Sequence, residues 1–260
     1  MASFLGKVIA VTGGASGIGQ ATARLLAARG ATVSIADVQQ EALTTTADSI
    51  QEATPDAKVL TKLVDVSSSQ QVDAWIQETV SRFGQIDGAA NVAGIVGRDL
   101  NNTLAADADG EDFDRVMAVN VKGTFNCLKA QLGAMKDQGR GSIVNATSVA
   151  GVRGYARSIA YTASKHAIIG MTKTAAVDYS DRNIRVNAIA PGAIDTPIMR
   201  NNQGGATDAE FAARVRQSVP MRRFGTVEEA ALLIAFLLGG DSTYCTGSVF
   251  MIDGGMTAGI

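Results

Sequence analysis

Cysteine, histidine and aromatic side chains are scarce in this chain, and their scarcity excludes several kinds of site. The 260 residues include two cysteines, one histidine and 5% aromatic residues. Cys127 and Cys245 lie far apart and form no C-x-x-C pattern, so neither a disulfide framework nor a zinc site is indicated. A catalytic metal would have to be held by carboxylates alone. We therefore expect no metal, and a cytoplasmic location in a reducing environment.

Long apolar runs and a strong excess of one charge are also missing. The longest apolar run, 230–238, is too short to span a bilayer and predicts a buried helix. The N-terminal residues include no cationic segment and no small-residue cleavage site, so we expect no targeting segment. The formal net charge of -2 gives no electrostatic reason to expect nucleic acid or an anionic membrane as a partner.

Glycine and aliphatic residues are abundant, and they follow an alternating pattern. The chain is 46% hydrophobic and has 28 glycines. Short β-branched runs alternate with longer stretches of helical period, which is typical of βαβ units that build a parallel sheet. We predict one α/β domain over residues 1–260, with a doubly wound, seven-stranded parallel sheet of the Rossmann type. Strands are expected at 7–12, 32–36, 58–64, 87–90, 141–146, 184–189 and 248–252, and helices at 17–29, 39–53, 69–83, 111–136, 157–181 and 227–238.

One segment, 195–218, interrupts this alternation after the sixth predicted strand. It is polar and contains the run N-N-Q-G-G at 201–205. In a doubly wound sheet the ligand crevice lies at the carboxyl ends of the strands, so a long segment there can cover it. We interpret 195–218 as a substrate lid; an ordinary surface insertion is the alternative.

The turn after the first predicted strand is rich in glycine. Residues 12–19 read T-G-G-A-S-G-I-G and stand between a strand and a helix. In that setting glycines let backbone amides and the positive end of a helix meet a pyrophosphate. We expect the turn to bind a dinucleotide, although a purely structural turn is an alternative. The residues expected to contact the dinucleotide are Gly13, Ser16, Gly17, Ile18 and Gly19.

Asp37 closes the second predicted strand, about twenty residues beyond the glycine turn, where a carboxylate can accept both ribose hydroxyls of an adenosine. A 2′-phosphate would meet a like charge there, and neither Ser16 nor Val38 supplies a cation to hold it. The sequence therefore favours NAD over NADP. Asp37 and Gln40 also have the spacing of a capping box, so Asp37 could instead cap the next helix, and the two roles can coexist.

The third and fourth predicted strands also end in polar or small residues. Asp65 and Val66 close the third strand, and Asn91, Ala93 and Gly94 close the fourth. The carboxyl ends of parallel strands meet at one edge, so these residues are in place to line an adenine and the ribose next to it. Simple strand termination is the alternative.

Tyr161 and Lys165 occupy positions i and i+4 of a predicted helix and therefore share one of its faces. A nearby cation lowers the pKa of a phenol toward the range in which it can move protons at neutral pH. Ser148, thirteen residues before Tyr161, follows the fifth predicted strand and offers a hydroxyl in the same crevice. The pair alone could arise by chance, but its context indicates a catalytic site.

These motifs together resemble the short-chain dehydrogenase/reductase superfamily, in its shorter single-domain branch. The resemblance covers nearly the whole chain. The family's T-G-x-x-x-G-x-G falls on 12–19, its N-x-A-G on 91–94, its catalytic Asn and Ser on Asn120 and Ser148, and its Y-x-x-x-K on Tyr161 and Lys165. The segment that closes over the nicotinamide in the family falls on Pro191, Gly192, Ile194 and Thr196. Val92 departs from the pattern, because the family usually has a second Asn there. A weaker likeness is to fungal members of specialised metabolism.

The resemblance implies an oxidoreductase that transfers a hydride between NAD(H) and a small-molecule secondary alcohol or ketone. Tyr161 would be the acid/base, Ser148 would hold the substrate oxygen, Lys165 would bind the nicotinamide ribose and lower the tyrosine pKa, and Asn120 would anchor a proton-relaying water. The family's usual homotetramer is implied as well. An NADP(H)-dependent ketoreductase, a cofactor sensor or scaffold, and a non-redox enzyme of the same fold are the alternatives.

The sequence says less about the substrate than about the reaction. The pocket is expected to include Ser148, Arg153 and Tyr155, with Val149, Ile194 and the lid 195–218 around them. The single histidine, His166, lies five residues from Tyr161 and so points away from the catalytic face of the helix, which predicts a surface or interface residue.

Overall fold

The computed structural model describes residues 3–98, 102–202 and 206–259. Its sheet is seven-stranded and all parallel, with the order β3-β2-β1-β4-β5-β6-β7, so the predicted fold class is confirmed. The seven predicted strands are all present, with ends that differ from prediction by a residue or two. Their bounds are β1 Val8–Thr12, β2 Thr32–Asp37, β3 Val59–Leu63, β4 Gly88–Asn91, β5 Gly141–Ala146, β6 Ile184–Pro191 and β7 Val249–Ile252.

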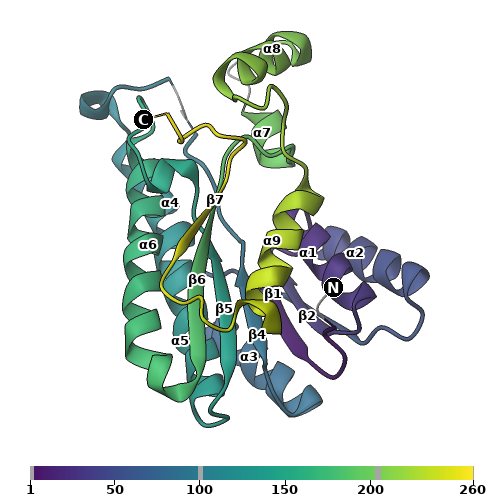
Figure 1. Cartoon of the computed structure of the whole chain (residues 1–260). Helices are drawn as coiled ribbons and strands as arrows, with labels where there is room; N and C mark the ends of the chain where they lie inside the picture. The colour runs from purple at the N-terminus through teal and green to yellow at the C-terminus, as the bar shows by residue number, and fades with distance from the viewer. Residues whose placement is uncertain (1–2, 99–101, 203–205, 260) are drawn as a thin grey trace.

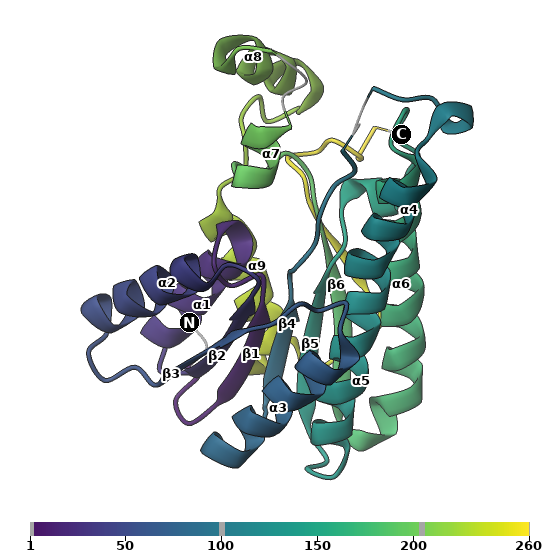
Figure 2. The same cartoon turned by 180° about the vertical axis from the view of Figure 1, so that it is seen from behind.

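Helices cover both faces of the sheet (Figure 1). On one face lie α1 (Gly17–Ala28), α2 (Gln40–Ala53) and α9 (Val227–Leu238), and on the other α3 (Ser69–Phe83), α5 (Gly123–Lys136) and α6 (Ile159–Tyr179), as the reverse view in Figure 2 also shows. The strands are apolar on both sides for this reason: Val144 packs into the first layer and its neighbour Ile143 into the second. The order of strands reverses between β1 and β4, which places the ligand crevice at their carboxyl ends.

The predicted helix at 111–136 is present as an unbroken helical stretch, but a π-helical turn interrupts its α-helical pattern. The segment forms α4 (Gly110–Met117), a π-helical turn at Ala118–Lys122, and α5. Gly123, the first residue of α5, packs against the chain that follows β3. A Cβ at Gly123 would lie 2.6 Å from the Val66 side chain. π-Turns of this kind are rare and frequently mark functional sites, and this one contains Asn120.

The predicted lid contains two helices beyond the carboxyl edge of the sheet, α7 (Pro197–Asn201) and α8 (Asp208–Ser218), which stand at the top of Figure 1. Residues 203–205 of the predicted lid lie outside the described residues. Thr207 and Glu210 form a capping box that fixes the start of α8. A small apolar cluster joins α8 to the chain around it: Ala193, Val215 and Val219 are buried, with Met199, Phe211, Phe224 and Met256 packed against them.

Four short 3-10 helices also lie among the described residues. They are η1 (Ala105–Asp107), η3 (Val149–Gly151), η4 (Ser180–Arg182) and η5 (Gly240–Ser242). The predicted helix 157–181 begins at Ile159 and continues after Tyr179 as η4.

A buried polar cluster fixes α3 on the sheet. The Trp75 indole N–H donates to the Ser34 hydroxyl at 2.8 Å, and the Ser34 and Thr79 hydroxyls lie 2.7 Å apart. All three side chains are fully buried. Buried polar groups are costly when they lose their partners, so this cluster depends on each of its members.

We therefore expect Ser34→Ala to lower the free energy of unfolding by about 2 kcal/mol, because it leaves the Trp75 indole N–H without an acceptor in the core. Urea unfolding would measure the change. Ser69→Ala, at the exposed first residue of α3, is the matched control and is expected to have little effect. Equal stability of the two variants would contradict this account of the cluster.

Candidate functional site

The glycine turn lies at the carboxyl end of β1, packed tightly on the end of β4. Gly13 has φ +68°, and a Cβ there would lie 2.9 Å from the Ala93 backbone nitrogen. At Gly19 a Cβ would lie 2.1 Å from the Gly13 carbonyl oxygen. Ser16 is the N-cap of α1 but its side chain makes no capping hydrogen bond. The amide groups that begin α1 thus form a donor cradle of the kind that binds a phosphate.

Asp37 lies beside this turn. One of its carboxylate oxygens accepts the Ala15 amide at 3.1 Å, and the other accepts the Gln39 amide at 3.2 Å. The N-cap of α2 is Gln39, without a side-chain capping bond, so the alternative that Asp37 caps this helix was wrong. The carboxylate instead joins the end of β2 to the glycine turn, and its remaining lone pairs can accept further donors.

The side chain of Asn91, a residue expected to line the cofactor, is turned into the protein interior. Its amide exchanges hydrogen bonds with Gln131 on α5 at 2.9 and 2.7 Å and donates to Asn145 at 2.9 Å, all in the buried interior. Only main-chain atoms of Asn91 are available to a cofactor. No local pattern in the sequence pairs Asn91 with Gln131, because the two residues lie 40 positions apart.

The backbone after Asn91 is fixed by Thr12 at the end of β1. The Thr12 hydroxyl accepts the amides of both Val92 and Ala93 at 3.1 Å. Gly94 follows, where a Cβ would lie 3.3 Å from the Lys165 ammonium nitrogen and 3.2 Å from the Asn120 amide oxygen. The end of β4 thus leads directly to two of the predicted catalytic residues.

The structure brings Tyr161, Lys165 and Ser148 together at the carboxyl end of β5. The Lys165 Nζ lies 5.5 Å from the centroid of the Tyr161 ring. Burial raises the pKa of Tyr161, whereas a hydrogen bond from the Ser148 side chain lowers it and the neighbouring Tyr155 raises it. Ser148 itself begins η3, with its Oγ accepting the Ala150 amide at 3.1 Å. A phenol, a hydroxyl and an ammonium therefore share one site.

Lys165 is buried, with 4% of its surface exposed. Its ammonium donates to the Ala146 carbonyl at 3.0 Å, which leaves two N–H donors for other partners. Burial lowers its pKa to about 8. The ammonium is thus held at the end of β5 in a place from which it can bind a hydroxyl of a cofactor's ribose.

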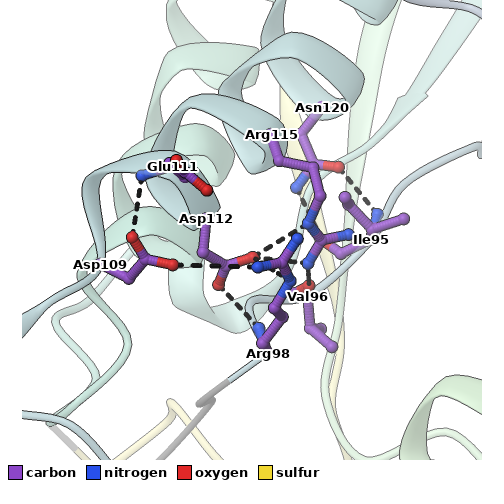
Figure 3. Close-up of polar contacts among 8 residues, drawn as sticks. All are labelled: Ile95, Val96, Arg98, Asp109, Glu111, Asp112, Arg115 and Asn120. Atoms are coloured by element: carbon purple, nitrogen blue, oxygen red, sulfur yellow. Dashed lines mark hydrogen bonds and ion pairs between the residues drawn. The ribbon is translucent and has the colours of Figure 1, made fainter.

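Asn120 uses its side chain to hold the chain that leaves β4, as Figure 3 shows. Its Oδ1 accepts the Ile95 amide at 2.8 Å, and its Nδ2 donates to the Ile95 carbonyl and to the Ser164 hydroxyl, both at 2.9 Å. Asn120 is fully buried, and its partner Ser164 lies on α6, where the Ser164 hydroxyl donates to the Tyr161 carbonyl at 2.7 Å. A water bound at Asn120 remains a prediction.

Arg153 and Tyr155 form a wall beside Tyr161. Arg153 donates to the Tyr155 hydroxyl at 2.6 Å and to the Met256 carbonyl at 3.4 Å, and its guanidinium lies 4.7 Å from the Tyr155 ring centroid. The charge of the Tyr155 phenol raises the pKa of Tyr161. A role for Arg153 and Tyr155 in a substrate pocket remains a prediction.

The segment after β6 returns to the glycine turn. At Gly192 a Cβ would lie 2.8 Å from the Asp253 Cα, and the buried Ile194 forms a bridge with Gly225. Thr196 caps α7, and its methyl carbon would lie 3.4 Å from a Cβ placed on Gly17. Pro191, the last residue of β6, and Thr196 therefore bracket a short segment at the edge of the cradle.

The other predicted residues lie at the margins. Asp65 is exposed and accepts hydrogen bonds from Ser67, while Val66 is buried against α5. His166 is exposed, and its Nδ1 lies 2.9 Å from the Thr162 carbonyl of its own helix. Within the part of the chain that the structure describes, no cluster of His, Cys, Asp and Glu could hold a metal ion, and no helix is long and apolar enough to cross a membrane.

Two residues that contact the chain after β4 were missed by the sequence reasoning. Asp112 and Arg115 on α4 form a partly buried ion pair at 2.6 Å that contacts the chain leaving β4 (Figure 3). Their spacing, i and i+3, is common on exposed helices, so the sequence did not distinguish them from a surface pair.

Comparisons with known proteins agree with this geometry. The family model described as Enoyl-(Acyl carrier protein) reductase matches residues 13–257. A short-chain dehydrogenase/reductase ABA4 from Pyricularia oryzae is 46% identical over 96% of this chain and 91% of its own length. Levodione reductase from Leifsonia aquatica is 42% identical over 98% of this chain and 96% of its own.

Solved structures are similar over almost the full length. The crystal structure of levodione reductase has a TM-score of 0.94 at 40% identity, covering 99% of this chain and 100% of that one. An NAD+-bound xylitol dehydrogenase has a TM-score of 0.90 at 39% identity, covering 97% and 99%. The chain belongs to the short-chain dehydrogenase/reductase family and is an oxidoreductase of that family.

The lowered pKa of Lys165 makes stability depend on pH. Its folded pKa of about 8 lies below the ordinary 10.5, so between these values the unfolded chain holds a proton that the folded chain has lost. Stability conferred through Lys165 therefore rises with pH in this window. We expect wild type to gain about 2 kcal/mol of unfolding free energy relative to Lys165→Met between pH 8 and pH 10.

Urea unfolding at a series of pH values would measure this difference. Lys173→Met, at an exposed position of the same helix, is the control and is expected to show a difference from wild type that does not change with pH. If the difference in unfolding free energy between wild type and Lys165→Met also does not change with pH, the Lys165 pKa is not lowered in the folded protein.

Proposed function

We propose that the protein is an NAD(H)-dependent dehydrogenase that interconverts a small secondary alcohol and the corresponding ketone, with Tyr161 as its acid/base. The observation that carries the proposal is the buried Lys165 ammonium, 5.5 Å from the Tyr161 ring centroid and bonded to the Ala146 carbonyl at the end of β5. This placement of a cation beside a phenol, in a ligand crevice, suits proton transfer.

The residues present fit a nicotinamide dinucleotide. The glycine turn has no room for a Cβ at Gly13 or Gly19, and the uncapped start of α1 offers amide donors to a pyrophosphate. Asp37 would accept the adenosine ribose hydroxyls, and Gly94 and Lys165 would lie at the other ribose. Ile18, Asp65, Val66, Ala93 and the segment from Pro191 to Thr196 would complete the binding surface. When bound, the nicotinamide supplies or accepts the hydride.

The chemistry of this chain's own residues follows from their positions. In alcohol oxidation the Tyr161 phenolate takes the proton of the substrate hydroxyl, and in ketone reduction the phenol returns it. The Ser148 hydroxyl donates to the substrate oxygen and steadies its negative charge. The Lys165 ammonium favours the phenolate by its charge, against the burial that raises the Tyr161 pKa.

The substrate class is supported by the relatives and by the pocket. One relative is named a levodione reductase and another structure is a xylitol dehydrogenase with NAD+ bound. Arg153 and Tyr155 would contact the substrate beside Tyr161, and the helices of 195–218 would cover it. We also propose a homotetramer in the cytoplasm; the Val177 side chain, 78% exposed on α6, is available to a subunit contact.

We expect Tyr161→Phe to bind NADH as wild type does and to lose at least about 1,000-fold in kcat, because the acid/base is removed while the cofactor cradle is untouched. Stopped-flow or steady-state oxidation of NADH with a panel of cyclic and linear ketones would measure kcat. Tyr244→Phe, at a fully exposed tyrosine, is the control. Wild-type turnover in Tyr161→Phe would remove the tyrosine from the mechanism.

We expect NADH to bind at least about ten-fold more tightly than NADPH, because Asp37 meets a 2′-phosphate with a like charge. Fluorescence titration of each cofactor would show this. Asp37→Asn should narrow the difference, and Asp56→Asn, an exposed acid before β3, should leave it unchanged.

The alternatives correspond to different outcomes of the same titration. Tighter NADPH binding would make the protein an NADP(H)-dependent ketoreductase. Binding of either cofactor without turnover of any carbonyl would favour a sensor or a non-redox enzyme.

A further inference from the structure

The chain that leaves β4, residues 92–98, is held in place by side chains from other elements; we name it the β4 exit segment. Thr12 accepts the amides of Val92 and Ala93, and Asn120 bonds both the amide and the carbonyl of Ile95. Two further contacts to the segment come from side chains of α4. The Arg115 Nη2 donates to the Val96 carbonyl at 3.2 Å, and the Asp112 carboxylate accepts the Arg98 amide at 2.7 Å.

Asp112 is the centre of the α4 contacts (Figure 3). It is 8% exposed, and its Oδ1 accepts both Nε and Nη2 of Arg115, at 2.9 and 2.6 Å, while its Oδ2 accepts the Arg98 amide. Burial would raise the pKa of Asp112, but the hydrogen bonds from Arg115 and Arg98 outweigh it and hold the pKa below its ordinary value. The carboxylate is therefore charged at neutral pH, and its oxygens are occupied by protein donors.

Gly97 allows this close approach. A Cβ at Gly97 would lie 2.8 Å from the Asp112 Oδ2, so a larger residue would push the carboxylate away from the backbone. Arg98 adds only a weak charge contact, since its Nε lies 3.9 Å from Asp112 and its side chain is 62% exposed. The pair that fixes the segment is thus Asp112 with Arg115 rather than the exposed Arg98.

Both ends of the β4 exit segment lie at the catalytic residues. At one end, Gly94 packs against the Lys165 ammonium and the Asn120 amide. At the other, Gly97 and Asp112 line a small cavity that Tyr161 also lines. A shift of the segment would therefore move groups beside both Lys165 and Tyr161, and misplacements of about 1 Å at such sites can cost about 100-fold in rate.

We propose that Asp112 and Arg115 are positioning residues, which hold the β4 exit segment against α4 and thereby set the geometry around Lys165 and Tyr161. The inference rests on the proposed function for its effect on rate. Asp112 does not reach substrate or cofactor as an acid or base, because Arg115 and the Arg98 amide occupy it.

The test compares Asp112→Asn with Asp114→Asn, which makes the same charge change at an exposed position of the same helix. For Asp112→Asn we expect kcat to fall by about ten-fold or more, with the dissociation constant of NADH changed by less than about two-fold. Asp114→Asn should match wild type. Arg115→Lys, which keeps the charge but loses the forked geometry, should lose kcat in the same direction.

A double-mutant cycle separates positioning from simple loss of stability. If the two residues act as one unit, Asp112→Asn combined with Arg115→Lys should lose little more kcat than either alone, whereas independent effects would multiply. Each kcat is calculated per NADH-binding site, so that unfolded protein does not lower it. An unchanged kcat in Asp112→Asn, or a loss that disappears when kcat is calculated in this way, would overturn the proposal.

Amide hydrogen exchange distinguishes failure of this inference from failure of the proposed function. In Asp112→Asn the amides of Ile95 and Arg98 should exchange at least about ten-fold faster than in Asp114→Asn, whether or not any carbonyl is turned over. If the wild-type protein turns over no carbonyl and these amides still exchange faster in Asp112→Asn, the positioning role is retained and the proposed reaction is rejected. Exchange equal to that of Asp114→Asn would reject the positioning role itself.

Discussion

The ammonium of Lys165, buried at the carboxyl end of β5, is the constraint on which the rest of the site depends. A buried cation is tolerated only when donors and acceptors around it are arranged to hold it, and here the Ala146 carbonyl does so. The same burial lowers its pKa to about 8, so the charge beside the Tyr161 ring is itself close to titration. The end of β5, helix α6 and the backbone at Gly94 all lie within a few ångströms of this ammonium.

The parallel sheet makes this meeting possible. Because the order of strands reverses between β1 and β4, the turns that follow them diverge and leave an opening. The glycine turn after β1 fills one side of it and the residues after β4 and β5 the other. Thr12 joins the two sides, since its hydroxyl accepts two amides of the chain that leaves β4. Binding and chemistry thus share a single edge of the sheet.

The sequence predicted the sheet well because strand and helix periods differ clearly, and it predicted the glycine turn, Tyr161 and Lys165 because local spacing defines them. It did not predict the π-turn at 118–122, since one extra residue in a helix leaves no mark in an apolar pattern. Nor did it predict that the Asn91 side chain pairs with Gln131 and Asn145. Such long-range polar pairs depend on tertiary packing, and local patterns carry no information about them.

The apolar cluster beside α8 connects that helix to residues near Tyr161. Met256, near the end of the described chain, packs with Val215 and Val219 at the base of α8, and its carbonyl accepts a hydrogen bond from Arg153. Arg153 in turn holds the Tyr155 hydroxyl next to Tyr161. Packing and hydrogen bonds therefore connect α8, the chain around Met256 and the Tyr155 phenol in one continuous series of contacts.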